Sequence, residues 1–206
     1  MNKIAIGIIT ALIMVSSVFT VRIEASTILY YTSSPFSWVG GGETVAVTRE
    51  DGFAFFASRN YDNGVSFGIN DFATNPDDQA QRSFSLDLAA PYDAVLLPGH
   101  YADATRFPFQ EEAYPGLSFS GYGRGNNTLL GYFDVYEVTY GVHDEVLTFA
   151  ADFVQYDGGF EDAWNRGSIR YNSDYPIPEP STFALLLAGL PFLGFIWYNT
   201  QNRRTP

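Results

Sequence analysis

LLGYFDVYEVTY (residues 129–140) and EVLTFAADFVQY (residues 145–156) are two apolar-rich stretches joined by the short sequence GVHD. Both are rich in Val, Phe and Tyr and alternate in polarity, which is typical of strands that bury one face. A four-residue link that contains Gly favours a hairpin. One face of the second strand carries four apolar residues, and Phe133 and Val135 of the first strand meet them; the four are Leu147, Phe149, Ala151 and Phe153. The hairpin therefore predicts an antiparallel sheet with an apolar inner face.

Shorter segments of the same kind surround the hairpin. They are separated by turns rich in Gly, Asn and Asp and cover residues 43–48, 53–58, 65–70, 83–88 and 167–172. Between residues 26 and 176 no stretch shows a sustained helical period, and no internal repeat of a solenoid or propeller is visible. We predict one all-β domain over residues 26–176, an antiparallel β-sandwich or a jelly-roll relative.

The composition excludes several function classes. The 206 residues include 23 acidic and 11 basic residues, which gives a net charge of −12, and no Cys. Without Cys there is no disulfide, no iron–sulfur cluster and no thiol nucleophile. A strongly acidic chain is repelled by phosphate backbones, so we predict no nucleic-acid partner. No cofactor and no metal are predicted either.

The N-terminus resembles an export signal. Residues 4–21 are almost entirely apolar and follow the basic Lys3. Ile23 and Ala25 suit the −3 and −1 positions of a cleavage site, so residues 1–25 are predicted to be a signal peptide. An uncleaved membrane anchor is the alternative, because the apolar run is long for a signal. The chain is exported under either reading.

The C-terminus combines three features in a fixed order. Pro178-Glu179-Pro180 is followed by an apolar run over residues 182–198 and by Arg203 and Arg204. At about 1.5 Å per helical residue that run reaches about 26 Å, close to the ~30 Å of a hydrocarbon core. We predict a single-pass transmembrane helix, with the arginine pair as a basic tail that stays in the cytoplasm.

These three features, taken together, resemble the PEP-CTERM sorting signal of Gram-negative bacteria. The resemblance covers residues 177–206, with two departures: Pro191 interrupts the helix, and the basic tail has only two Arg. It implies an exosortase, a membrane-embedded transpeptidase-like enzyme, as a partner. It also implies anchoring in the inner membrane before processing, and then a place at the cell surface or in an exopolysaccharide matrix.

A second resemblance covers residues 50–173. Residues 104–110, 116–121, 123–125 and 149–153 resemble a family of small exported bacterial β-domains that has no assigned activity. That family often carries a Cys pair. The corresponding positions of this chain lie near Asn126 and Asp157 and hold no Cys, so no disulfide is expected. The resemblance implies a single β-domain and supplies no catalytic residue.

Two pairs of carboxylates are candidates for sugar hydrolysis, which uses two acids. Glu111 and Glu112 are adjacent and are expected to splay apart. Glu137 and Asp152 lie on facing strands of the hairpin, where one carboxylate can raise the pKa of the other. The alternative is that such acids are solvated or bonded to an Arg such as Arg124 or Arg170.

The sequence contains none of the usual spacings of a metal or phosphate site. His100 and His143 have no metal-ligand spacing around them, and Asp71, Asp77 and Asp78 lack the alternating pattern of a calcium loop. The Gly-rich residues 40–42 and 121–125 open no helix with a Lys followed by Ser or Thr, so we interpret them as turns.

Three tyrosines suggest a ligand surface. Tyr132, Tyr136 and Tyr140 are expected on the face opposite Phe133 and Val135, where rings can stack on sugars or pack against a second layer. The sequence therefore favours a non-catalytic envelope or matrix protein, sorted by an exosortase, with a structural or weak carbohydrate-binding role. A polysaccharide-acting hydrolase is the alternative.

Overall fold

The structure is a computed structural model that describes residues 25–75, 77 and 81–177. The predicted signal peptide, the motif Pro178-Glu179-Pro180, the transmembrane run and Arg203 and Arg204 lie outside these residues, apart from Ala25 and Ile177. Within the described part of the chain no helix is long and apolar enough to cross a membrane.

Ten strands and one short 3-10 helix make up the described chain, and the all-β prediction is confirmed. The elements are β1 (Ser26–Ser33), β2 (Thr44–Thr48), β3 (Ala54–Arg59), β4 (Val65–Asn70), β5 (Ser83–Ala89), η1 (Pro91–Asp93), β6 (Gly99–Arg106), β7 (Gly116–Gly121), β8 (Leu129–Tyr140), β9 (Val146–Asp157) and β10 (Trp164–Ser173).

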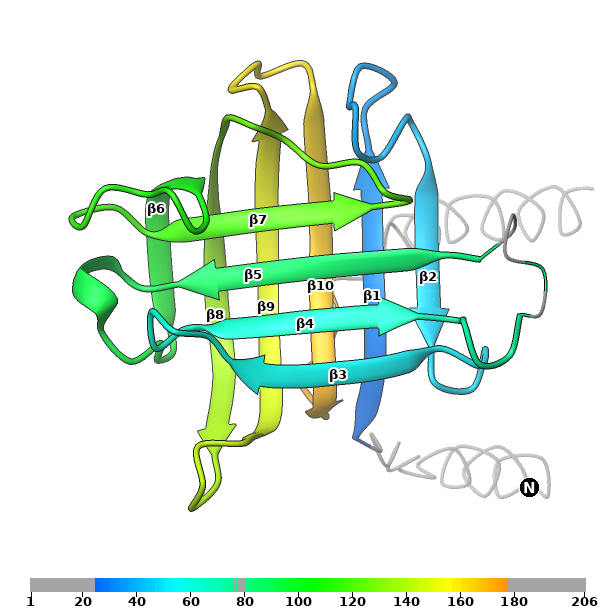
Figure 1. The fold of residues 1–206 in the computed structure, drawn as a ribbon, viewed down its shortest axis with the longest axis horizontal. Coiled ribbons are helices and arrows are strands. Elements are labelled where there is room, and N and C mark those ends of the chain that lie inside the picture. Colours follow the sequence, from blue (N-terminus) through cyan, green and yellow to red (C-terminus); the bar gives the residue numbers. More distant parts are fainter. Residues whose placement is uncertain (1–24, 76, 78–80, 178–206) are drawn as a thin grey trace, which may run out of the picture.

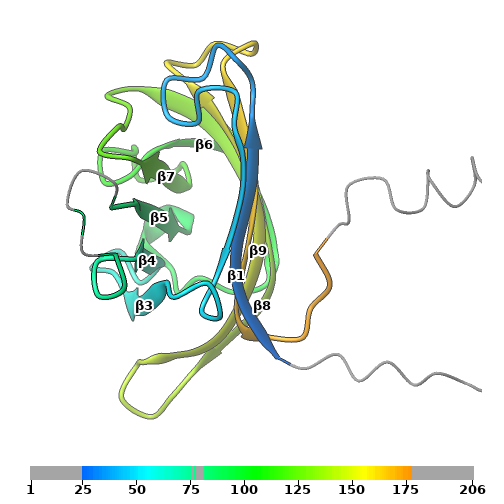
Figure 2. The same ribbon diagram turned by 90° about the vertical axis from the view of Figure 1, so that its right-hand side faces the viewer.

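All ten strands belong to one sheet, in the order β2-β1-β10-β9-β8-β6-β7-β5-β4-β3. The sheet curls so that β3, β4, β5 and β7 lie across the other six strands, nearly at right angles to them (Figure 1). Seen from the side, the two parts form two facing layers (Figure 2). We call the face of the six-stranded layer that is turned away from the other layer the outer face.

The curl occurs where β6 meets β7. Only two residue pairs join these strands, Thr105 with Gly116 and Arg106 with Leu117, and they form the only parallel pairing among the described strands. Every other neighbouring pair is antiparallel. Such a short junction leaves the two layers free to turn toward each other and bury their apolar faces.

Aromatic side chains fill the space between the layers. Phe67 of β4 packs on Phe149 of β9 with ring centroids 5.2 Å apart. Phe119 of β7 packs on Phe153 of β9 at 5.0 Å. Phe133 is also fully buried, and with Val135, Phe149, Ala151 and Phe153 it confirms most of the inner face that the hairpin predicted. The prediction is wrong for Leu147, which is 43% exposed, because a register shift between Thr139 and Tyr140 leaves Leu147 without a partner on β8. Rings of this size bury enough apolar area to hold the two layers together.

The loops at one end are held by a buried carboxylate. Asp157 accepts hydrogen bonds from side chains of the strands and from loops distant in sequence; the donors are Val39 N–H, Asn126 Nδ2, Gln155 Nε2, Asn165 Nδ2 and the Ser37 hydroxyl. Because these donors come from the β1–β2 loop, the β7–β8 loop, β9 and β10, one side chain fixes the relative positions of several segments.

Three strands were not predicted from the sequence. β1 follows directly on the predicted signal peptide, and β7 is short. β6 contains a register shift between Tyr101 and Ala104, and Asp103 there has a φ of 56°. A strand with this interruption loses the simple alternation that sequence patterns rely on.

Candidate functional site

β8 places alternate side chains on the outer face. Gly131, Phe133 and Val135 point inward and are buried, whereas Leu130 and Tyr132 point outward and are exposed. This alternation is the one that the sequence predicted for the first part of the strand.

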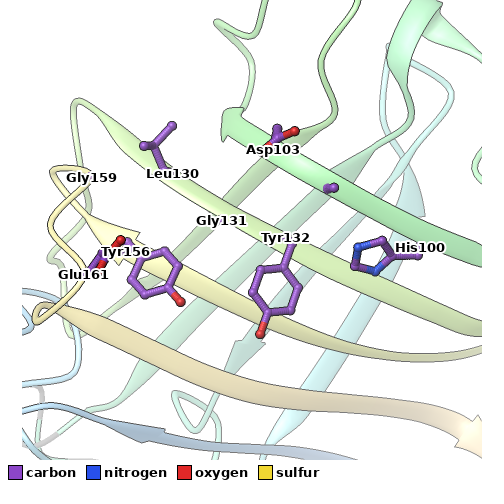
Figure 3. Close-up of a pocket in the computed structure, with 9 residues that line it drawn as sticks. His100, Asp103, Leu130, Gly131, Tyr132, Tyr156, Gly159 and Glu161 are labelled. Carbon is purple, nitrogen blue, oxygen red and sulfur yellow. The ribbon is translucent and has the colours of Figure 1, made fainter.

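A hollow of about 530 Å³ lies on the outer face where β6, β8 and β9 run side by side (Figure 3). Its lining residues are His100, Ala102, Asp103, Leu130, Gly131, Tyr132, Tyr156, Gly159 and Glu161. A second hollow of about 590 Å³ shares Asp103 and Leu130 with the first. Its other lining residues are Thr105, Phe109, Glu111 and Tyr114. We call the two together the outer groove.

Aromatic rings form one side of the outer groove. Tyr156, Tyr132 and His100 lie in a row across β9, β8 and β6 (Figure 3). The rings of His100 and Tyr132 are 5.9 Å apart between centroids and are inclined at 49°. His100 is further held by Asp134, whose Oδ1 lies 2.6 Å from the His100 Nδ1. The row therefore presents fixed ring surfaces to a ligand.

Carboxylates supply the polar groups of the outer groove. The bulge in β6 turns Asp103 toward the first hollow, and Glu161 reaches it from the loop after β9 (Figure 3). Glu111 lines the second hollow. No Lys or Arg is among the described residues that line either hollow, so the groove repels anionic ligands and suits a neutral ligand with many hydroxyl groups.

Only one of the three predicted tyrosines lines the outer groove. Tyr132 does, with 38% of its surface exposed. Tyr136 is the extra residue of a bulge between Val135 and Glu137, so Tyr136 and Glu137 both lie outward. The bulge reverses the alternation, and Tyr140 packs against the hydrophobic core. The prediction that the three share one face is wrong, because the extra residue shifts the strand by one position.

The two displaced tyrosines have other partners. The Tyr140 hydroxyl donates to the Leu96 carbonyl oxygen at 2.9 Å, and burial raises the pKa of Tyr140. The Tyr136 ring stacks on Tyr175 at 4.5 Å, and its hydroxyl donates to Asp152 Oδ2 at 3.1 Å. Partial burial, together with the neighbouring Asp152 carboxylate, raises the pKa of Tyr136 to about 12. Both hydroxyls therefore stay protonated at neutral pH.

Each acid of the hairpin pair suggested for hydrolysis has a partner other than the second acid. Glu137 accepts a hydrogen bond from the Ser173 hydroxyl at 2.5 Å, and Asp152 Oδ1 lies 3.0 Å from Arg170 Nη2. The alternative interpretation, that Asp152 pairs with Arg170, is confirmed. Glu111 and Glu112 line different hollows, as expected for adjacent side chains that splay apart.

The remaining candidates have structural partners. Asp71 binds Arg82 through the backbone N–H and the guanidinium. Asp77 lies between β4 and β5, where its backbone N–H donates to Asn75 Oδ1 at 3.2 Å, and Asp78 is outside the described residues. His143 lies in the turn between β8 and β9, where its N–H donates to Glu145 Oε2. In the described part of the chain no three His, Cys, Asp or Glu side chains lie close enough together to hold a metal ion.

Sequence reasoning missed Tyr156, Asp103 and Glu161. Tyr156 ends the predicted second strand of the hairpin and points to the same side as Tyr132, a signal that the alternation of both strands contained. Asp103 and Glu161 depend on a bulge and on a loop, and nothing in the local sequence indicates either position.

Comparison with known proteins adds no relative. No family model, no curated protein and no solved structure matches this chain.

Proposed function

We propose that the protein is an exported, non-catalytic envelope or matrix protein that binds a neutral carbohydrate weakly in the outer groove. The observation that carries the binding role is the row of Tyr156, Tyr132 and His100 beside the carboxylates Asp103 and Glu161. Flat rings cover the apolar faces of sugars, and carboxylates accept hydrogen bonds from sugar hydroxyls. An open groove of this kind gives weak single-site binding, which gains strength when many copies crowd one surface.

The trafficking part of the proposal comes from the two ends of the sequence. Residues 1–25 would direct export across the inner membrane of a Gram-negative bacterium. Residues 177–206 would hold the protein there through a single helix, until an exosortase acts at Pro178-Glu179-Pro180. The β-domain, as an antiparallel sandwich related to jelly rolls, would then reach the cell surface or an exopolysaccharide matrix.

A glycan array tests the binding role. The chain with Tyr132→Ala or Tyr156→Ala is expected to lose about 5-fold or more in affinity for any glycan retained by the parent chain, by analogy with the ~1–3 kcal/mol that stacking of a nucleobase on one aromatic ring contributes. Tyr61→Ala is the matched control, because Tyr61 is exposed on the β3–β4 turn of the other layer. Equal retention of all variants would refute the groove, and retention of no glycan would leave a purely structural role.

The position of the acids favours a hydrolase as the second candidate. Asp103 and Glu161 both line the first hollow (Figure 3), and sugar hydrolysis uses two carboxylates that flank the scissile bond. Reducing-sugar release from the host's own exopolysaccharide, abolished by Asp103→Asn or Glu161→Gln, would replace the binding role with an enzymatic one. Glu137→Gln serves as the control, because Glu137 is bonded to Ser173 away from the groove.

Sorting is tested separately. Cells that make the variant with Pro178→Ala, Glu179→Ala and Pro180→Ala are expected to keep the protein unprocessed in the membrane fraction. If the size and location of this variant match those of the parent chain, the sorting proposal is wrong whatever the glycan array shows.

A further inference from the structure

Arg170 is a fully buried cation on the outer face of β10. Its Nη1 donates to the carbonyl oxygens of Ile169 and Ala151 at 2.9 and 2.8 Å, and its Nη2 lies 3.0 Å from Asp152 Oδ1. A buried guanidinium is stable only when its donors are paired. These contacts come from the sheet itself and leave part of the guanidinium facing outward.

The chain that follows β10 covers the rest of Arg170. Nε donates to the carbonyl oxygen of Tyr175 at 3.1 Å, and Nη2 donates to that of Pro176 at 2.9 Å. After β10 the chain turns and runs along the outer face (Figure 2). The guanidinium therefore binds the backbone of this segment at two consecutive carbonyl groups.

Two side-chain contacts add to the backbone contacts. The rings of Tyr136 and Tyr175 are nearly parallel, with an angle of 3° between them, and Arg170 lies 5.6 and 5.3 Å from their centroids. Ser173 Oγ donates to Glu137 and accepts the N–H of Tyr175 at 3.1 Å. These contacts depend on the bulge in β8, which places both Tyr136 and Glu137 on the outer face.

We propose that Arg170, Tyr136, Asp152 and Glu137 form a peptide-docking site whose ligand is the chain's own segment 173–176, and that this segment must be released before an enzyme can take hold of residues 178–180. We call the docked segment the C-terminal latch. The site recognises an extended peptide with two consecutive carbonyl groups and an aromatic ring. The part that concerns residues 178–180 rests on the proposed sorting function.

Chain length makes the latch a barrier to access. Pro178 lies two residues beyond Pro176 in the sequence, and two residues span at most about 7 Å. An enzyme that binds residues 178–180 in an extended conformation would therefore collide with the outer face while Pro176 remains docked. When the latch is released, residues 173–176 also become free of the outer face, so residues 178–180 can move farther from it.

Spin labels measure the latch directly in the full-length chain in detergent micelles. The chain has no Cys, so Ile177→Cys and Phe56→Cys introduce the only two labelling sites. Phe56 is exposed on β3, in the other layer. We expect one narrow distance distribution in this parent chain and a broadened one after Tyr175→Ala or Tyr136→Leu. Tyr61→Ala is expected to leave it narrow.

Hydrogen exchange gives a second readout that needs no label. In Tyr136→Leu the Tyr175 amide, bonded to Ser173 Oγ, should exchange roughly 2- to 10-fold faster, as expected for the loss of one aromatic pair. The amides of β9 and β10 should keep their rates. A broad distribution with fast exchange in the parent chain would overturn the latch, and so would narrow distributions in all variants.

Access is measured in cells that process the protein. Processing by the enzyme shortens the protein. The shortened form is expected to appear about 2- to 10-fold sooner in Tyr136→Leu and Tyr175→Ala than in Tyr61→Ala, as expected for the loss of one aromatic pair. An unchanged rate in the two latch variants would overturn the gating role. If no chain is processed at all, the sorting proposal and the gating role fail together, and the spin labels still decide the docking site.

Discussion

The side-chain amide of Asn165 donates a hydrogen bond to the Asp157 carboxylate at 2.8 Å inside the protein, where Asn165 is 0% exposed and Asp157 is 4% exposed. Asp157 also accepts the N–H of Val39 at 3.0 Å, so one carboxylate joins β10 to the loop after β1. A buried carboxylate surrounded by donors is costly to remove, because every donor then lacks a partner.

Replacement of Asp157 should therefore destabilise the fold. We expect Asp157→Ala to lower the free energy of unfolding by about 3 kcal/mol or more, since each buried group left unpaired costs about 1–3 kcal/mol. Urea unfolding of the full-length chain, followed by circular dichroism, measures this. Asp162→Ala is the control, because Asp162 is exposed in the same loop region; similar losses in the two variants would contradict the role of Asp157.

The reversed face of β8 predicts a difference between two tyrosine hydroxyls. Tyr140→Phe removes the bond to Leu96 and should lower the free energy of unfolding by about 1 kcal/mol. Tyr132→Phe should leave stability unchanged within about 0.5 kcal/mol, because Tyr132 lies on the open outer face. Parallel denaturation curves of the two variants test this, and equal stability would argue against the bulge at Tyr136.

Asp71 should make stability depend on pH. Burial by itself raises the pKa of Asp71, but the hydrogen bonds and the charge of Arg82 outweigh it, so the pKa lies below its usual value. The stabilisation from Asp71 is thus present above the unfolded pKa of about 3.9 and is lost as the pH falls through the lower folded pKa.

The variant Asp71→Asn measures this effect. It should be less stable than the parent chain by about 1.5–3 kcal/mol above pH ~4, the range for hydrogen bonds to charged groups. The difference should shrink as the pH is lowered further. Unfolding free energies measured across the pH range give both curves, and a difference that grows toward low pH would contradict the assigned sign. Asp162→Asn is the control with an exposed carboxylate.

The β-domain should fold without the two ends of the chain. The fragment of residues 26–177 contains all ten strands and the C-terminal latch. Its far-UV circular dichroism is expected to be that of a β-protein. A fragment of residues 34–177 should remain unfolded, because β1 lies between β2 and β10 in the sheet. A helical spectrum of the longer fragment, or a folded shorter one, would contradict this.

The local sequence determined the strands that alternate without interruption. The hairpin of β8 and β9 follows from residues 129–156, because apolar residues recur every second position on both sides of one short turn. Phe133 and Val135 were therefore placed in the core correctly. Composition likewise predicted that the domain has no disulfide, since the chain has no Cys.

The tertiary structure alone decided which outward residues form a site. A bulge at Tyr136 depends on hydrogen bonding between two strands, which the sequence of one strand does not encode, and it moved Tyr140 from the outer face to the core. The outer groove brings His100, Tyr132 and Tyr156 together from three strands, and the latch brings Arg170 to carbonyl groups beyond its own strand. Alternation along one strand determines which face of the sheet each side chain occupies. Which side chains of different strands become neighbours on that face is determined only by the register of the strands and the curl of the sheet.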